Sequence, residues 1–515
     1  MGRFIAFALL SLPLAGCATG ALNMAPDSPD RPWTPATSPG GEIVAGERTA
    51  PWQPQRTTYV LPSNEVMARV PAPELDLQRR GVYTLPQLID IAESSNPATR
   101  NAWNDARDAA LGAGIVESTF LPLVSAGIVQ GWQHSHNENS ALGSISTSNV
   151  TAQGNIEVLS IQWLLFDFGE RTALVDAAKQ GSVVSNIGFT AAHQQVIYNV
   201  SLAFYANAAA RARLASAGEA LRDAEEVESA AQSRYKQGYG TVVEVAQARQ
   251  ATAQAQLERI QAEGAAQNAY LALISAVGIS PMTKLKVADI SRRTLSASMM
   301  APVERTVSAA LARRPDVLTG YATLQASLAN LRAAQVAFLP KVFLAANGTR
   351  LSGNLDVTAI PGIGKDLPIL NLPNQVGFSG TQLGTTTLVG ATVPIYDGGL
   401  RAASLEQARD RVDKAETTLT QIRNEAVRQI IGARNTLKTS LAGYTASTAL
   451  AAAARTTFNA ALAAYRNGLG TISDVTTAER QLLQAKNART DAYSNALSTA
   501  ATLALSAGLL GSAPR

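Results

Sequence analysis

Few side chains of this sequence have the types and spacing that chemistry requires. His134 and His136 lie two residues apart, which places both on one face of a strand or in its loop. The chain has three histidines and one cysteine, so a polar extracellular loop explains this pair better than metal ligation does. Neither a Ser-His-Asp nor a Cys-His arrangement is available, and no phosphate loop motif occurs. The sequence predicts a protein that is not an enzyme and holds no metal or cofactor.

The most informative carboxylate stands beside a glycine-containing stretch that occurs twice. The stretch runs from Tyr235 to Glu244 and returns 230 positions later (465 − 235) from Tyr465 to Asp474. Its paired glycines allow a helix to end and the chain to reverse, and a Thr-x-x-acid spacing then starts the next helix. Each copy is predicted to be the tip of an antiparallel helical hairpin. Asp474 then has the role of a capping acid, which is compatible with facing a pore.

The composition indicates long helices. Of 515 residues, 46% are hydrophobic and only 5% are aromatic, as expected when helices pack closely over small side chains. The formal net charge is only +4, and no block of Lys and Arg occurs, so no nucleic-acid partner is predicted.

The N-terminus predicts export and lipidation. Arg3 precedes an apolar run that ends at Leu14-Ala-Gly-Cys17, which reads as a signal peptide over 1–16 and a lipid-bearing Cys17. Ala18 and not Asp follows the cysteine, and the resemblance to lipoproteins of Gram-negative bacteria then implies sorting to the outer membrane. Residues 17–82 are rich in Pro, Ser and Thr and are expected to form an extended arm.

The remaining chain is predicted to be a duplication. Each half contains a first helix, two strands, a very long helix, a tip and a returning helix. Prolines, and changes in the spacing at which hydrophobic residues repeat, mark the ends of these elements. The predicted bounds are repeat 1, 83–280 (strands in 121–166, long helix 169–234, tip 235–243, helix 244–277); linker 281–303; repeat 2, 304–510 (strands in 341–396, long helix 399–464, tip 465–473, helix 474–507); and tail 511–515.

The strands predict oligomerisation. Each of the four is expected to have about ten residues, the length of a tilted membrane-spanning strand. Four strands cannot close a barrel, and an open sheet edge in lipid is very costly. Three chains would supply twelve strands, an even number in the known range. The predicted fold class is mixed α and transmembrane β, an internally duplicated chain with long helical coiled-coil hairpins and four strands, three copies of which form a 12-stranded barrel.

The duplicated layout resembles the TolC-type outer-membrane efflux channels, in the lipoprotein branch that includes OprM and NodT. The residues that carry the resemblance are Leu14–Cys17, Phe120-Leu-Pro122, Leu165–Arg171, Val393–Arg401 and the two Tyr-x-x-Gly tips. The resemblance covers 17 to about 510 and implies a homotrimer in the outer membrane of a Gram-negative bacterium, with the barrel continued by a periplasmic helical tunnel. It also implies a periplasmic adaptor, an inner-membrane transporter and outer-membrane lipid as partners.

The resemblance also implies roles for the tip residues. The periplasmic aperture is expected at Asp474, and Thr477 stands where well-known members carry a second acid. The expected ring is therefore at most one set of three carboxylates, which would favour cations. The residues expected to contact the adaptor are Tyr235, Gly238, Gly240, Thr241, Tyr465, Gly468, Gly470 and Thr471. Both tyrosines are expected to pack at the tips.

The resulting functional prediction is a passive, adaptor-gated duct of a tripartite efflux system that exports small molecules. The duct of a type I protein-secretion system is the alternative within the class. A lipid-anchored periplasmic coiled-coil scaffold is the alternative from another class, and the four strands argue against it because a scaffold has no need of them.

Overall fold

A computed structural model describes residues 24–26, 29, 33, 35–44, 59–61, 63–74, 76–77, 81–141, 144–290, 295, 303–358 and 375–511. At 137–141, 144–149, 303–306, 355–358 and 375–378 only the main chain is described. The predicted signal peptide, Cys17 and most of the linker after 290 lie outside these residues. The chain forms two compact units, of which the smaller contains 1–79 with 280–284 and the larger contains 80–279 with 285–515.

The described part of the smaller unit contains one short antiparallel pair, β1 (Ala36–Thr37) with β2 (Ile43–Val44). Gly41 lies at the turn between these strands with φ of +85°, where an added Cβ would come within 2.9 Å of Val66. The backbone N–H of Glu74 donates to the Thr283 hydroxyl at 3.1 Å, so part of the segment between the repeats belongs to this unit.

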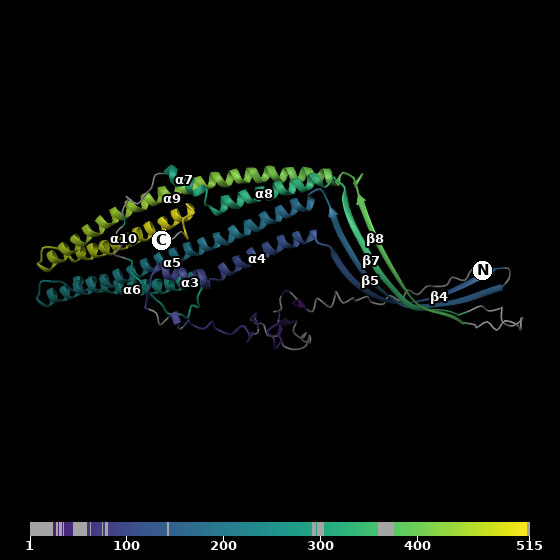
Figure 1. Cartoon of the computed structure of the whole chain (residues 1–515). Helices are drawn as coiled ribbons and strands as arrows, with labels where there is room; N and C mark the ends of the chain where they lie inside the picture. Colours follow the sequence, from purple (N-terminus) through teal and green to yellow (C-terminus); the bar gives the residue numbers. More distant parts are fainter. Residues whose placement is uncertain are drawn as a thin grey trace, which may run out of the picture. The chain divides into compact units, whose positions relative to one another are not determined.

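The larger unit is built on long helices (Figure 1). In the first half, α3 (Leu85–Ser95) and α4 (Pro97–Glu117) precede the strands, and α5 (Glu170–Lys236) and α6 (Val242–Val277) follow them. In the second half the order is α7 (Val303–Leu311), α8 (Pro315–Val336), α9 (Leu400–Arg466) and α10 (Ile472–Ser506). The long helices α5 and α9 have 67 residues each, which corresponds to about 100 Å of rise.

The duplication is visible in matching elements. Figure 1 shows α5 with α6 and α9 with α10 as two hairpins, with α4 and α8 beside the other ends of the long helices. A short parallel pair, β3 (Val82–Tyr83) with β6 (Lys286–Val287), joins the beginning of the first half to the segment after it. The core consists of small and aliphatic side chains that are buried along the length of the long helices. Phe204 is the largest fully buried side chain on α5.

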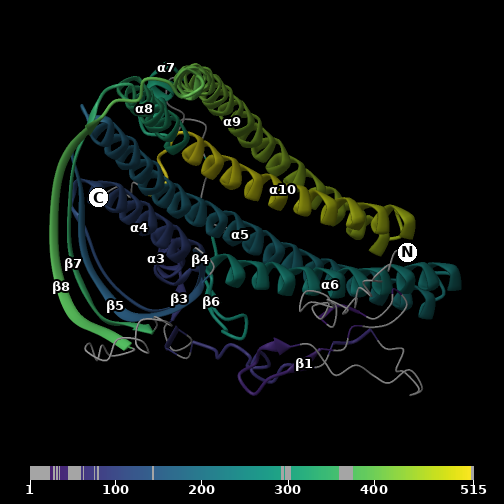
Figure 2. The same ribbon diagram turned by 90° about the vertical axis from the view of Figure 1, so that its right-hand side faces the viewer.

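Four antiparallel strands form one sheet in the order β4-β5-β7-β8. They are β4 (Leu123–Ala141), β5 (Ser144–Phe166), β7 (Lys341–Thr358) and β8 (Gln375–Thr392). The β5–β7 pairing joins the two halves, and Gly154 faces Gly353 in its register. An added Cβ at Gly353 would lie 2.4 Å from the Gln153 carbonyl oxygen, so this crossing requires glycine. Figure 2 shows the strands of the sheet as one strongly curved arc.

The strands are 18 to 23 residues long, and the expectation of about ten was wrong. The histidine pair was expected in a polar loop, yet residues 134–141 continue β4 and residues 144–153 belong to β5. Polar residues with good strand propensity extend a ladder whenever a neighbouring strand continues to supply hydrogen bonds. At the other end β8 stops at Thr392, before the expected Tyr396, because Pro394 cannot donate to a ladder.

No helix among the described residues is both long and apolar enough to cross a membrane.

Candidate functional site

The two hairpin tips share one backbone geometry. Gly238 and Gly468 adopt φ of +78° and +77°, values that L side chains rarely adopt. The N–H of Tyr239 donates to the Arg234 carbonyl at 2.9 Å, and the N–H of Leu469 donates to the Ala464 carbonyl at 2.8 Å. These bonds satisfy carbonyls at the helix ends and reverse the chain, as in a left-handed C-terminal cap.

The helices that leave the tips begin differently. At the second tip the Thr471 hydroxyl accepts from the Asp474 N–H at 3.3 Å, and Asp474 Oδ2 accepts from the Thr471 N–H at 3.0 Å. Asp474 is exposed, and the hydrogen bonds from Thr471 hold the pKa of its carboxyl below the usual value. At the first tip the Thr241 hydroxyl accepts from the Glu244 N–H at 3.2 Å, but the second bond of a capping box, from the Thr241 N–H to the Glu244 carboxylate, is not formed. The expected full box at Thr241 was therefore wrong.

The Glu244 carboxylate instead binds the other hairpin. The Tyr465 hydroxyl donates to Glu244 Oε2 at 3.0 Å, and Arg234 Nη1 donates to the Tyr465 carbonyl at 2.7 Å. The Arg234 guanidinium also stacks 4.8 Å from the centre of the Tyr465 ring. Burial, followed by the hydrogen bond and charge of Glu244, raises the pKa of Tyr465 to about 12. Tyr465 therefore stays neutral and joins three of the four hairpin helices.

An apolar cluster surrounds Tyr465, which is only 1% exposed. The other buried members are Val227, Ala231, Val245, Ala248, Phe458, Leu462, Ile472, Val475, Ala478 and Leu482. Its counterpart Tyr235 is 48% exposed, so of the two tyrosines expected to pack at the tips only Tyr465 is buried within one chain. Thr477 is exposed on the same helix as Asp474. One turn of helix thus presents Asp474 and Thr477 outward.

Glu479 is a site residue that was not expected from the sequence. This side chain is 6% exposed on α10, and burial, then the nearby charges of Asp223 and Glu258, raises its pKa to about 7. Arg480 opposes the shift without cancelling it. A glutamate amid apolar heptad positions is the only sequence signal that would have pointed to it. The tip region therefore contains one carboxyl that titrates near neutral pH.

Replacing Tyr465 with phenylalanine tests the hydrogen bond between the hairpins. The Glu244 carboxylate loses its phenolic donor, which costs about 1.5–3 kcal/mol for a bond to a charged group. We expect amide hydrogen exchange around 465–475 to accelerate roughly 10- to 100-fold. Tyr239→Phe is the matched control, because that ring is 76% exposed. Equal protection in the two variants would contradict a role for the hydroxyl.

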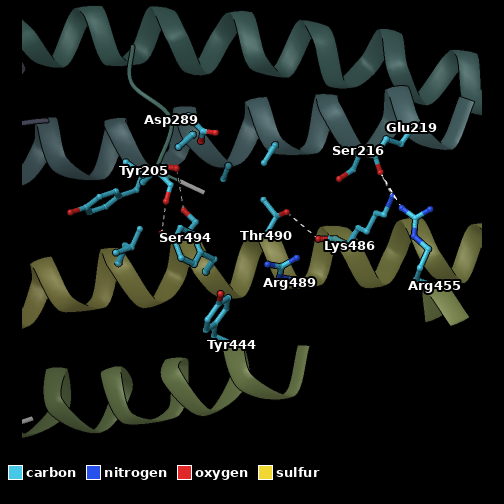
Figure 3. Close-up of a pocket in the computed structure, with 16 residues that line it drawn as sticks. Tyr205, Ser216, Glu219, Asp289, Tyr444, Arg455, Lys486, Arg489, Thr490 and Ser494 are labelled. Atoms are coloured by element: carbon cyan, nitrogen blue, oxygen red, sulfur yellow. Dashed lines mark hydrogen bonds and ion pairs between the residues drawn. The ribbon is translucent and has the colours of Figure 1, made fainter. Parts of the chain in front are cut away.

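Farther along the hairpins lies a cavity of about 360 Å³. Figure 3 shows side chains of α5 and α10 around it, with Tyr444 of α9 and Asp289 at its border. Lys486 and Arg455 both pair with Glu219, and the hydrogen bond from Lys486 lowers the pKa of Glu219. These charges pair between α5 of the first hairpin and the two helices of the second hairpin, α9 and α10. The cavity has no arrangement of a nucleophile with a base among its described lining residues.

The two histidines of the sequence analysis lie on β4, where His134 Nδ1 is 3.0 Å from the Thr151 hydroxyl on β5. The assignment of His134 to a loop was wrong. Within the described ranges no cluster of His, Cys, Asp and Glu has the geometry to hold a metal ion.

The comparisons place this architecture among outer-membrane channels. The family described as "Outer membrane efflux protein" matches residues 88–279 and 306–509, which include both halves of the duplication. The protein CyaE of Bordetella pertussis is 25% identical over 430 residues, 83% of this chain and 84% of its own. The outer membrane protein OprJ of Pseudomonas aeruginosa is 25% identical over 385 residues, 75% of each chain.

A solved structure shows the same fold. The outer membrane protein VceC of Vibrio cholerae aligns with a TM-score of 0.61 and 21% identity, over 82% of this chain and 96% of that one. The fold is that of the TolC-type channels, with duplicated helical hairpins and a four-stranded sheet, as the sequence predicted. This chain belongs to the outer membrane efflux protein family.

Proposed function

We propose that this chain is the outer-membrane duct of a tripartite efflux system and exports small molecules passively. It works as a homotrimer with a periplasmic adaptor and an inner-membrane transporter, which supplies the energy. The duct has no catalytic role of its own. A lipid on Cys17 anchors the chain, and the segment before it is a cleaved signal.

The observation that supports this function most directly is that the four-stranded sheet is open at two edge strands, β4 and β8. Among the residues that the structure describes, β4 and β8 each pair with one neighbouring strand, so each has one edge that no described strand covers. An unpaired edge is very costly in lipid. Three copies joined edge to edge supply twelve strands and leave no edge. The helical hairpins then extend the duct into the periplasm and end at the tips.

Electron microscopy of the detergent-extracted protein tests this function. We expect a threefold tube whose helical part alone is about 100 Å long. The Cys17→Ser variant should still need detergent for release, because the strands hold it in the membrane without the lipid. A monomer, or a rod without a lumen, would favour a periplasmic scaffold.

The tips form the aperture and its adaptor contacts. Asp474 is exposed and ionised, so three copies would place three carboxylates near the axis. Thr477 lies one helical turn after Asp474 and adds no charge to this ring of carboxylates. The adaptor contacts Tyr235, Gly238, Gly240, Thr241, Gly468, Gly470 and Thr471, and the tip glycines leave the backbone accessible. Tyr465, which was also expected to contact the adaptor, is only 1% exposed and is left out of this surface.

Replacing Asp474 with alanine should raise single-channel conductance roughly twofold and weaken cation preference, because the three carboxylates no longer retain cations at the narrowest point, where tightly held ions slow conduction. Asp474→Asn is the matched control, since it removes the charge but keeps an oxygen that can cap the helix. Similar changes in both variants would assign the effect to charge. Unchanged conductance and selectivity in both would contradict an aperture at Asp474.

A further inference from the structure

The cavity between α5, α9 and α10 is bordered by the segment that follows β6 (Figure 3). The Tyr493 hydroxyl donates to the Ile290 carbonyl at 2.6 Å, and Arg211 Nη1 donates to the Val287 carbonyl at 2.8 Å. These bonds fasten the segment to α10 and to α5. Small side chains of α5 leave space between the helices, and they are Ala208, Ala209, Ala212 and Ser216. The cavity is therefore formed within one chain.

The cavity combines aromatic with cationic side chains. The rings of Tyr444 on α9 and Tyr493 on α10 lie with their centres 5.4 Å apart. The cations of the described lining are Lys486 and Arg489 on α10 and Arg455 on α9. Lys486, Arg489 and Tyr493 follow one another at intervals of three and four residues, which places them on one face of α10. A molecule in this cavity would therefore meet tyrosine rings and positive charges together.

Arg489 is the cation of this cavity that has no carboxylate partner among the described residues. Glu219 pairs with both Lys486 and Arg455. Within the part of the chain that the structure describes, the Arg489 side chain forms neither an ion pair nor a hydrogen bond. Asp289 is the second carboxylate of the described lining and lies at its border (Figure 3). Three cations thus stand against two carboxylates, and the excess charge is positive.

The duplication explains why Arg489 lacks a partner. A shift of 230 positions matches Arg489 to Arg259 and Tyr493 to Glu263 (489 − 259 and 493 − 263). On α6, Arg259 Nη1 lies 3.8 Å from Glu263 Oε2, one helical turn away. On α10 the position of that glutamate is occupied by Tyr493, whose ring faces Tyr444. The second repeat therefore has an aromatic surface where the first has the partner of the guanidinium.

We propose that this cavity binds a small aromatic carboxylate, with the carboxylate on Arg489 and the ring against Tyr444 and Tyr493. The parallel N–H donors of a guanidinium match the two oxygens of a carboxylate. Aromatic rings pack favourably on one another in offset or edge-to-face arrangements. A volume of about 360 Å³ is at the lower end for small-molecule sites, which favours a ligand with a single ring. The site needs one chain only and does not depend on the proposed duct.

Titration of the detergent-extracted full chain with benzoate tests this site. By saturation-transfer NMR we expect a dissociation constant on the order of 1 mM, as the few atoms of benzoate allow. Benzamide has the same ring without the charge and should bind roughly 10-fold more weakly or worse. High salt should weaken the binding of benzoate, because Arg489 is exposed.

Replacing Arg489 with glutamine should weaken the binding of benzoate roughly 10- to 100-fold, because the charge-assisted hydrogen bonds are lost. The binding of benzamide should change by less than about twofold, since it never used that charge. Arg259→Gln is the matched control, because it removes the same charge at the equivalent position of the first repeat, and it should leave both affinities unchanged. Tyr444→Leu should weaken both ligands by about 2- to 10-fold.

The outcomes separate this site from the proposed function. Binding of benzoate that Arg489→Gln leaves unchanged would overturn the site, as would equal affinities for benzoate and benzamide. Inorganic phosphate that binds as tightly as benzoate would overturn the ligand class, because the ring would then contribute nothing. A threefold tube that binds no benzoate would overturn the site and leave the duct intact. A monomer that binds benzoate would overturn the duct and leave the site.

Discussion

Replacing Arg171 with alanine is expected to destabilise the junction between β5 and α5 by about 3–5 kcal/mol, as the loss of one partner from a buried ion pair does. Arg171 Nε donates to Asp167 Oδ2 at 2.7 Å, and Nη1 donates to the Thr119 carbonyl at 2.8 Å. Its guanidinium also lies 4.7 Å from the centre of the Phe120 ring. The side chains of the pair are 9% and 6% exposed, so water cannot replace the lost partner.

Amide hydrogen exchange at 167–175 measures this effect. We expect exchange on the order of 100-fold faster or more in the variant. The duplication supplies a matched control, because Arg401 and Asp397 form the same pair at 3.4 Å with both side chains 24% exposed. Arg401→Ala should have a clearly smaller effect at its own junction. Equal effects at the two junctions would show that burial does not set the strength of the pair.

Replacing Glu479 with glutamine should stabilise the hairpin contact at high pH. The folded pKa of about 7 lies above the ordinary value of 4.5, so ionisation of Glu479 opposes folding. Stability is fully present below pH 4.5 and is lost as the pH rises through 7. Glutamine removes that loss, which corresponds to about 2–3 kcal/mol above pH 7.

The measurement is hydrogen exchange at 475–485, corrected for intrinsic rates, at pH 8 and pH 5. At pH 8 the variant should exchange roughly 30- to 100-fold more slowly than the wild type, and at pH 5 the two should differ by less than about fivefold. Glu263→Gln is the matched control, because that carboxylate is 48% exposed and faces Arg259 on its own helix. A benefit of Glu479→Gln that is the same at both pH values would contradict titration of Glu479 in this range.

The local pattern was sufficient to predict the order of elements in each half. Pro97 and Pro315 begin helices, and the paired glycines end them at the tips. These are effects of one residue on its own backbone, and they act in the same way in any fold. The same locality explains why the Thr471–Asp474 capping box was predicted correctly.

The length of the strands could not be predicted from the local sequence pattern. The polar residues of 134–141 and 144–153 have no apolar alternation, and they form strands because β4 and β5 pair with each other and β5 pairs with β7. A ladder hydrogen bond depends on whether a neighbouring chain segment is present, and the segment that completes β5 lies some 200 residues away in the second half.

The sequence by itself determined the duplication, the hairpin tips and the family, because they follow from spacing and from the conformations of Gly, Pro and Thr. The tertiary structure decided which contacts each of two residues at equivalent positions in the repeat makes. Glu244 and Asp474 share one position in the repeat, yet Glu244 binds Tyr465 of the other hairpin while Asp474 caps its own helix. Tyr465 is buried and Tyr235 exposed for the same reason: a neighbour covers one tip within the chain, and burial depends on neighbours that no local pattern encodes.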